Sequence, residues 1–227
     1  MVKVVVFDAY GTLFDVNAAA RRVAEEGQFE GFADAWPTVS QSWRLKQLQY
    51  TWLRAVTGAH ADFWQVTQDG LDWALEAAGL SERPELRARL LALYRELDAY
   101  PEVPAMLRSL REAGRGTAIL SNGSPGMLEA AVGSAGIGED LDAILSVESV
   151  GVFKPARAVY DLVGSTFGTR PDQVLFVSSN GWDAAAAAGY GFRTLWANRA
   201  GEPVDRLPWR PDRIAPDLTS VPEVVAE

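Results

Sequence analysis

The 227-residue sequence contains no cysteine and a single histidine, His60. The absence of cysteine excludes disulfides, thiolate metal ligands and a cysteine nucleophile. One histidine cannot build a histidine-rich metal cluster, so no such site is expected. His60 lies just before Asp62 and Phe63, and we expect it in a solvated loop.

The chain also has fewer basic than acidic residues, with 21 Lys and Arg against 30 Asp and Glu, so its net charge is −9. An acidic surface gains no counterion-release energy from nucleic acid or from an anionic membrane, so neither is an expected partner. No stretch approaches the roughly 20 apolar residues of a transmembrane helix. The apolar run after Lys3 is too short for a signal peptide. We therefore expect a cytoplasmic protein.

The pattern of apolar residues changes along the chain. Residues 2–7 form a continuous apolar, β-branched run, which predicts a buried parallel strand. From Val16 to about Ala99 the spacing is helical, with helices predicted around residues 43–56, up to Gly79 and over 86–97. No strand pattern interrupts this stretch. It predicts an all-helical domain over residues 15–99, inserted after the first strand.

Beyond Pro101, strand and helix patterns alternate. The predicted strands span residues 116–120, 143–147, 173–177 and 193–196, and the predicted helices span 126–134, 156–167, 182–188 and 222–226. Such alternation predicts a parallel sheet covered by helices on both faces. The fold class is therefore α/β, with a core made of residues 1–14 and 100–227.

Polar side chains follow the predicted strands: Asp8, Ser121 with Asn122, Lys154 and Asp183. Parallel sheets bind ligands at the carboxyl ends of their strands, so these residues are expected to meet at one edge. The helical insertion leaves the core just after Asp8 and is therefore placed to cover that edge as a cap.

These residues resemble the motifs of the haloacid dehalogenase superfamily: Asp8 before Gly11 and Thr12, then Ser121, Lys154 and Asp183 in this order. The resemblance covers nearly the whole chain and implies a Rossmann-like core. Phosphatases of the superfamily carry a second aspartate two residues after the nucleophile, where this chain has Tyr10. They also carry an acid four residues before the last aspartate, where this chain has Ser179.

Both substitutions remove hard oxygen ligands of the kind that magnesium requires. We therefore expect neither a metal nor another cofactor.

Five segments resemble the (S)-2-haloacid dehalogenases in particular. They are FDAYGTLFD (7–15), WRLKQLQYTWL (43–53), SNGSP (121–125), KPARAVY (154–160) and SSNGWD (178–183). The resemblance implies hydrolysis of short (S)-2-haloalkanoic acids to (R)-2-hydroxy acids, with inversion and through an ester on Asp8. It also implies that the partners are a small haloacid and water, and that the chain forms a homodimer.

The resemblance assigns the catalytic roles as follows. Asp8 attacks the halogen-bearing carbon, Lys154 holds Asp8 ionised and oriented, and Thr12 orients it. Tyr160 contacts the lysine or the nucleophile, although a core tyrosine is an equal alternative. Water activation falls to Asp183, with Ser178 and Asn180 on the same loop. Whether Asp183 is the base or the counterion of Lys154 stays open at this point.

The substrate-binding roles follow in the same way. Arg44 and Asn122 match the halide-binding donors of the family. Ser121 and the backbone N–H groups of Ala9 and Tyr10 are expected to bind the substrate carboxylate. An apolar wall is implied for Leu48, Phe63 and Trp182, with plain packing of the helical domain as the alternative.

Two other functions remain open. A phosphatase of the same superfamily predicts magnesium-dependent hydrolysis of p-nitrophenyl phosphate. A catalytically idle binding or dimerisation module predicts no halide release, and it leaves the joint presence of Asp8, Arg44, Asn122, Lys154 and Asp183 without a reason.

Overall fold

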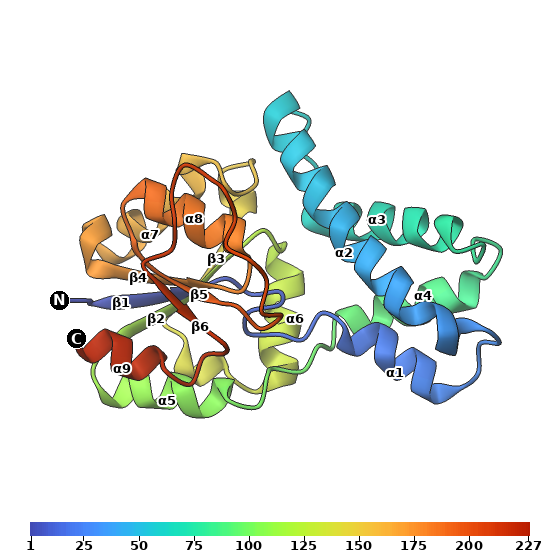
Figure 1. Ribbon diagram of the computed structural model, residues 1–227, viewed down its shortest axis with the longest axis horizontal. Helices are drawn as coiled ribbons and strands as arrows, with labels where there is room; N and C mark the ends of the chain where they lie inside the picture. Colours follow the sequence, from blue (N-terminus) through green and yellow to red (C-terminus); the bar gives the residue numbers. More distant parts are fainter.

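The computed structural model describes residues 1–227, which form an α/β core beside a lobe of helices (Figure 1). Its six-stranded sheet has the order β3-β2-β1-β4-β5-β6, and every neighbouring pair is parallel. The predicted α/β fold class is confirmed. The strands are β1 (Val4–Phe7), β2 (Gly116–Ser121), β3 (Ala143–Ser146), β4 (Val174–Ser178), β5 (Arg193–Ala197) and β6 (Arg213–Ala215).

Strand β1 lies at the centre of the sheet, and all four of its residues are buried. Its unbroken apolar run reflects contact with helices on both faces, as in other parallel sheets. Strand β6 is the one strand that the sequence does not predict. It has three residues at the sheet edge, two of them exposed, so it leaves no apolar pattern to detect.

Five helices belong to the core: α5 (Val103–Glu112), α6 (Pro125–Ala135), α7 (Arg157–Phe167), α8 (Gly181–Tyr190) and α9 (Val221–Ala226). Helices α7 and α8 lie on one face of the sheet, and α5 and α9 on the other (Figure 1). Helix α5 was not predicted from the sequence, although its buried residues, Val103, Met106, Leu107 and Leu110, have helical spacing. Its first turn contains a proline, a position where the missing N–H costs nothing.

The lobe contains four helices and no strand: α1 (Ala18–Glu26), α2 (Phe32–Thr57), α3 (Phe63–Ala77) and α4 (Pro84–Tyr94). The longest, α2, packs against α1 and α3. It buries Trp43 and Gln47, whereas Leu53 and Val56 near its end are 61% and 87% exposed. None of the helices combines the length and apolar character needed to cross a membrane.

Two linkers join the lobe to the core, and they run side by side. Phe14 pairs with Ala99 in an antiparallel bridge. The Asp15 N–H donates to the Asp98 carbonyl at 3.0 Å, and the Tyr100 N–H donates to the Leu13 carbonyl at 2.9 Å. The paired linkers fix the point at which the lobe leaves the core. This point, at Phe14, lies six residues after Asp8 in the chain.

His60 makes a second contact between the lobe and the core. Its Nε2 lies 2.9 Å from Glu148 Oε2, and its ring packs on Phe153 at 4.8 Å between centroids. His60 lies in a loop, as expected, but its side chain is only 24% exposed and pairs with Glu148, so it is not a freely solvated residue. Its partners come from a part of the chain almost ninety positions away, so nothing in the local sequence indicates them.

Leu107 gives a test of how α5 packs. It is fully buried on the face that meets the sheet, whereas the next residue, Arg108, is exposed. Leu107→Ala should lower the free energy of unfolding by about 2–5 kcal/mol, because it leaves a cavity in the core. The matched control Arg108→Ala should change it by less than about 0.5 kcal/mol. Equal urea midpoints for the two variants would contradict this packing.

Candidate active site

Asp8 follows the central strand β1 directly, and its backbone N–H donates to the Val177 carbonyl of β4 at 2.9 Å. Three side-chain donors point at its carboxylate. Lys154 Nζ lies 3.1 Å from Oδ1, while Thr12 Oγ1 and Asn180 Nδ2 lie 3.0 and 2.9 Å from Oδ2. The carboxylate is therefore held in one orientation by groups from three loops.

The turn after Asp8 depends on Gly11. Its φ is +86°, a conformation that residues with a side chain rarely adopt. A Cβ at this position would also lie 3.1 Å from Ser179 Oγ. The glycine thus lets the turn bring Thr12 back to Asp8 and close to the loop after β4.

Lys154 is buried between two carboxylates, with Nζ 3.1 Å from Asp8 Oδ1 and 2.8 Å from Asp183 Oδ2. Its side chain is only 1% exposed. Burial by itself would lower the pKa of Lys154, but the charges of Asp183 and Asp8 outweigh burial and raise it. Lys154 is therefore an ammonium at neutral pH and supplies the positive charge next to Asp8.

Asp183 is fully buried in the first turn of α8. Its Oδ2 receives Lys154, and its Oδ1 accepts a hydrogen bond from the Tyr160 hydroxyl at 2.8 Å. Burial raises the pKa of Asp183, and Lys154 opposes this effect. We expected the Tyr160 hydroxyl to contact Lys154 or Asp8, but it donates to Asp183 instead. Burial beside this carboxylate raises the pKa of Tyr160 well above its ordinary value.

The loop after β4 is shaped by its own polar groups. Ser178 Oγ accepts the Asn180 N–H at 3.1 Å, and the Ser179 N–H donates to Thr12 Oγ1 at 2.8 Å. Trp196 Nε1 donates to the Ser179 carbonyl at 3.0 Å. These bonds place Asn180 so that its amide reaches both Asp8 and Arg44.

A small cavity of ≈ 20 Å³ lies in front of Asp8, between the core and the helical lobe. Ten residues line it: Asp8, Tyr10, Arg44, Leu48, Phe63, Ser121, Asn122, Lys154, Asn180 and Trp182. Every one of them is among the residues that the sequence predicts for the site. The five remaining predicted residues, Ala9, Thr12, Ser178, Asp183 and Tyr160, are buried behind this lining.

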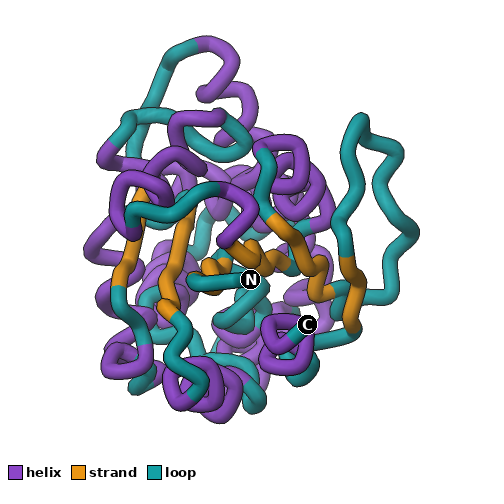
Figure 2. Tube along the Cα trace, turned by 90° about the vertical axis from the view of Figure 1, so that its left-hand side faces the viewer, coloured by secondary structure: helices purple, strands orange, loops and turns teal.

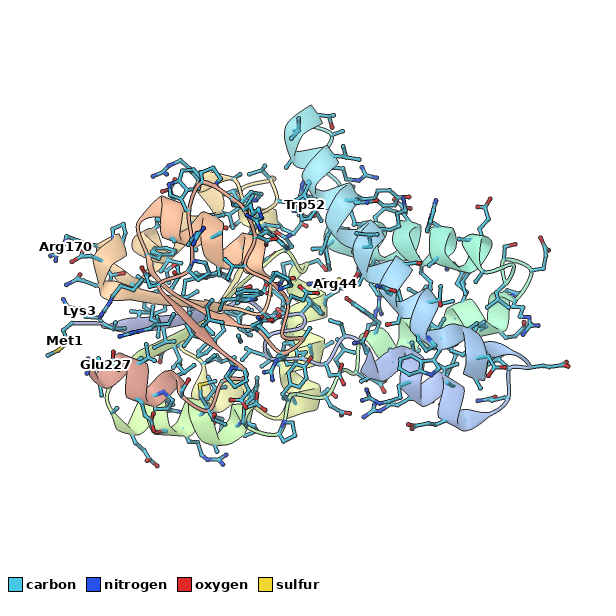
Figure 3. All side chains as sticks on the ribbon, viewed as in Figure 1. Met1, Lys3, Arg44, Trp52, Arg170 and Glu227 are labelled. Carbon is cyan, nitrogen blue, oxygen red and sulfur yellow. The ribbon has the colours of Figure 1, made fainter.

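Several hydrogen-bond donors surround the cavity. Arg44 projects from α2 toward the core (Figure 3), where it donates to the Tyr10 carbonyl and to Asn180 Oδ1, both at 3.1 Å. Asn122 Oδ1 accepts the Lys154 N–H at 3.0 Å, which leaves its amide N–H groups for other acceptors. The backbone N–H groups of Ala9, Tyr10 and Asn122 donate to no protein group. Such a set of donors suits an anionic ligand.

Ser121 forms part of the same edge. Its Oγ accepts the Gly123 N–H at 3.0 Å, so its own hydroxyl hydrogen remains free to donate. Gly123 is needed here because a Cβ would lie 2.8 Å from the Tyr10 ring. Because Gly123 has no side chain, the backbone can turn close to the Tyr10 ring, and this turn holds Ser121 and Asn122 at the cavity.

The site does not fit a divalent cation. The position of the second acid of phosphatases holds Tyr10, whose ring stacks on Tyr94 at 5.7 Å between centroids. Its hydroxyl is buried without a hydrogen-bond partner, and burial raises its pKa well above the ordinary value. The other acid position holds Ser179, with Oγ 3.1 Å from Thr12 Oγ1. The two remaining carboxylates, Asp8 and Asp183, both face the Lys154 ammonium instead.

The site residues predicted from the sequence do not include two supporting groups, the Gln47–Tyr94 pair and Arg199. Gln47 Nε2 donates to Thr67 Oγ1 at 3.0 Å and to the Tyr94 hydroxyl at 3.1 Å, which fixes the ring on which Tyr10 stacks. Arg199 donates to the Thr12 carbonyl at 2.9 Å. Tyr94 follows the apolar pattern of its helix and so is indistinguishable from a core residue by sequence. Arg199 is 187 positions from its partner.

Comparison with known proteins gives one consistent result. A family model described as haloacid dehalogenase-like hydrolase matches residues 2–191. An (S)-2-haloacid dehalogenase of Pseudomonas sp. (strain CBS-3) is 44% identical over 202 residues, which cover 89% of this chain and 87% of the relative. The chain belongs to the (S)-2-haloacid dehalogenase family. An (S)-2-haloacid dehalogenase of Xanthobacter autotrophicus is 45% identical over 192 residues, covering 85% of this chain and 73% of the relative.

Solved structures of L-2-haloacid dehalogenases agree over the full length. One matches with a TM-score of 0.93 and 41% identity, covering 100% of this chain and 99% of its own. The Xanthobacter autotrophicus enzyme with chloropropionic acid covalently bound matches with a TM-score of 0.86 and 37% identity, again covering 100% and 99%. Membership of the (S)-2-haloacid dehalogenase family makes the chain a hydrolase acting on carbon–halide bonds.

The buried ion pairs predict how a lysine substitution behaves. Lys154→Met should lower the free energy of unfolding at pH 7 by about 3–5 kcal/mol, because it leaves Asp8 and Asp183 without a counter-charge. Since burial raises the pKa of Asp183, its folded form takes up a proton more readily than the unfolded chain. The free energy of unfolding lost in Lys154→Met should therefore be partly regained as the pH falls toward 4, because Asp183 becomes protonated and loses its charge.

Urea denaturation of both proteins at pH 7 and pH 4.5 measures this difference. Lys3→Met, at an exposed position, is the control and should match the wild type at both pH values. A gap between wild type and Lys154→Met that widens at the lower pH would contradict the assignment.

Proposed function

We propose that this chain hydrolyses short (S)-2-haloalkanoic acids to (R)-2-hydroxy acids, without a metal and through an ester on Asp8. The observation that carries the proposal is the cavity in front of Asp8. In this cavity the Asp8 carboxylate faces the ammonium of Lys154, and the lining also contains the hydrogen-bond donors Arg44 and Asn122. The covalent chloropropionic acid in the related Xanthobacter autotrophicus structure supports a covalent route.

In the first step, a carboxylate oxygen of Asp8 attacks C2 of the substrate on the side opposite the halogen. The new C–O bond forms as the C–halogen bond breaks, and the halide leaves with the electron pair, so the configuration inverts. Arg44 and the Asn122 amide are the donors for the departing halide. The backbone N–H groups of Ala9 and Tyr10 and the Ser121 hydroxyl hold the substrate carboxylate.

The direction of attack follows from how Asp8 is held. Thr12 and Asn180 both bond to Oδ2, and Lys154 bonds to Oδ1, so the carboxylate cannot rotate without losing donors. A nucleophile fixed in this way reacts as if at a high local concentration. Leu48, Phe63 and Trp182 line the cavity with apolar surface and receive the substituent on C2.

In the second step, water attacks the carbonyl carbon of the Asp8 ester. Esterification removes the charge of Asp8, which leaves Asp183 as the one carboxylate bonded to Lys154. We assign a relay in which the water gives one proton to Lys154 while Lys154 gives one of its own to Asp183, with Ser178 and Asn180 holding the loop. The alkyl oxygen receives a proton as its bond to the carbonyl carbon breaks, and the second proton of the overall reaction is released to solvent.

Asp183 acts in this scheme through Lys154. Both of its oxygens are bonded, to Lys154 and to Tyr160, and it does not line the cavity. Its position therefore favours the role of counterion over that of a base in direct contact with the water. Tyr160 is a positioning residue, because its hydroxyl fixes the carboxylate rather than any substrate atom.

The ester route predicts where oxygen from water appears. A single turnover in ¹⁸O-water, with enzyme in excess over 2-chloropropionate, should give unlabelled 2-hydroxypropionate, because its new oxygen comes from Asp8. Repeated turnovers should place ¹⁸O in the peptide that contains Asp8, as measured by mass spectrometry. Label in the product of the first turnover would exclude the ester. Asp8→Asn should give neither label nor halide.

Stereochemistry and metal dependence are tested by one halide-release assay. (S)-2-Chloropropionate should release chloride and give (R)-lactate, while the (R) enantiomer should react at least about 100-fold more slowly, because inverted geometry misplaces the reacting carbon. EDTA should leave the rate unchanged, and p-nitrophenyl phosphate with Mg²⁺ should not be hydrolysed. Equal rates for the enantiomers, or a rate restored only by Mg²⁺, would count against the proposal.

A further inference from the structure

A second cavity lies beside the catalytic one and is much larger, at ≈ 440 Å³. We call it the outer pocket. Its lining is formed by Trp52, Ala55, Val56, Pro155, Trp182, Ala185, Ala186, Leu207, Pro208 and Trp209. All of these side chains are apolar, and no residue of the lining carries a charge. The steps of the proposed reaction do not use this space.

The outer pocket continues the catalytic cavity along three parts of the chain. On α2, Leu48 lines the catalytic cavity, and Trp52 and Ala55 line the outer pocket. These three residues follow one another at helical spacing on one face of the helix. Figure 3 shows Trp52 and Arg44 on the side of α2 that faces the core.

The core side shows the same continuity. Lys154 lines the catalytic cavity, and the next residue, Pro155, lines the outer pocket. Asn180, just before α8, lines the catalytic cavity, and Ala185 of α8 lines the outer pocket. Trp182 is the single residue that lines both. Its side chain is therefore the partition between the two spaces.

Trp182 is not fixed by a hydrogen bond. Its Nε1 is buried without an acceptor, and its ring packs edge-on against Trp52 at 5.3 Å between centroids. Because no hydrogen bond is lost when this indole turns, its displacement costs only packing. The partition is thus held by packing alone, whereas the opposite side of the catalytic cavity, at Asp8 and Lys154, is held by an ion pair.

The loop between β5 and β6 supplies Leu207, Pro208 and Trp209 to the outer pocket. The loop between β5 and β6 passes over α8 and extends from the sheet edge in the side view (Figure 2). Trp209 of this loop lies against Gly189, where a Cβ would be only 2.3 Å from the indole. At the mouth, Val56, Leu207 and Trp209 are 87%, 42% and 54% exposed, so the pocket opens to solvent.

We propose that the outer pocket is a subsite for the alkyl chain of longer 2-haloalkanoic acids, reached when Trp182 turns aside. The inference rests on the proposed function, since the substrate carboxylate and halogen stay at the donors around Asp8. The catalytic cavity, at ≈ 20 Å³, is far smaller than the outer pocket, at ≈ 440 Å³, so an alkyl chain longer than that of a short haloacid needs this second space. Each methylene that enters an apolar pocket strengthens binding about two- to fourfold.

The first experiment measures binding without turnover. Calorimetric titration with propionate, hexanoate and octanoate should give affinities that rise about two- to fourfold per methylene beyond butanoate. Ala55→Leu and Ala186→Leu fill the outer pocket from α2 and from α8, and each should weaken octanoate about tenfold while changing propionate less than twofold. Ala33→Leu, at an exposed position of α2 outside the pocket, is the matched control and should behave as wild type.

The second experiment measures bromide release from (S)-2-bromopropionate, -hexanoate and -octanoate. Wild type should keep or raise kcat/KM with chain length, and Ala55→Leu should lower it about tenfold for the octanoate alone. Turnover of 2-bromopropionate with none of the hexanoate, and no gain in alkanoate affinity with length, would overturn the subsite. Absence of turnover with all three, together with length-dependent alkanoate binding, would instead overturn the proposed reaction and retain the subsite.

A second copy of this chain is the competing occupant of the exposed apolar mouth. Sedimentation of wild type and Val56→Glu distinguishes it. A dimer that dissociates in Val56→Glu, with alkanoate affinity independent of chain length, would show that the pocket is an interface and overturn the subsite. An unchanged association state with length-dependent affinity supports it.

Discussion

The ammonium of Lys154 between Asp8 and Asp183 is the interaction on which the site depends. Two buried carboxylates this close would repel each other and favour protonation, and the lysine keeps both in contact with one cation. The surrounding polar groups act on the same triad. Tyr160 holds the far oxygen of Asp183, and Thr12 and Asn180 hold that of Asp8. Because each member restrains the next, the Asp8 carboxylate is oriented before any ligand arrives.

The same triad explains why the superfamily fold carries different chemistry here. A magnesium site needs several hard oxygens around one point, and this chain offers a phenol ring at Tyr10 and a hydroxyl at Ser179 in place of two acids. The charge beside Asp8 is instead supplied by Lys154. Donors for an anion then gather across the cavity, from Arg44 on the helical lobe and Asn122 on the core. The arrangement suits displacement of a halide from a substrate that is itself an anion.

The helical lobe completes the site and sets its size. Arg44, Leu48 and Phe63 reach the cavity from α2 and α3, and the paired linkers at Phe14 and Ala99 fix where the lobe attaches. The lobe also forms one wall of the outer pocket, through the same face of α2. With the proposed subsite, substrate size would be set where the lobe meets the core, at Trp182, which lines both cavities.

The sequence by itself determined five of the six parallel strands, and its resemblance to the (S)-2-haloacid dehalogenases implied all ten residues that line the catalytic cavity. Strand ends in such a sheet must meet at one edge, and the motifs that follow them are local in the chain. The contacts of Lys154 and Thr12 with Asp8 were expected from the sequence, but other partners were decided by the tertiary structure alone. Tyr160 bonds to Asp183, and His60 pairs with Glu148, because those contacts depend on packing between segments 23 and 88 positions apart. The outer pocket was likewise invisible, since an apolar residue that lines a cavity and one that fills a core look the same in sequence.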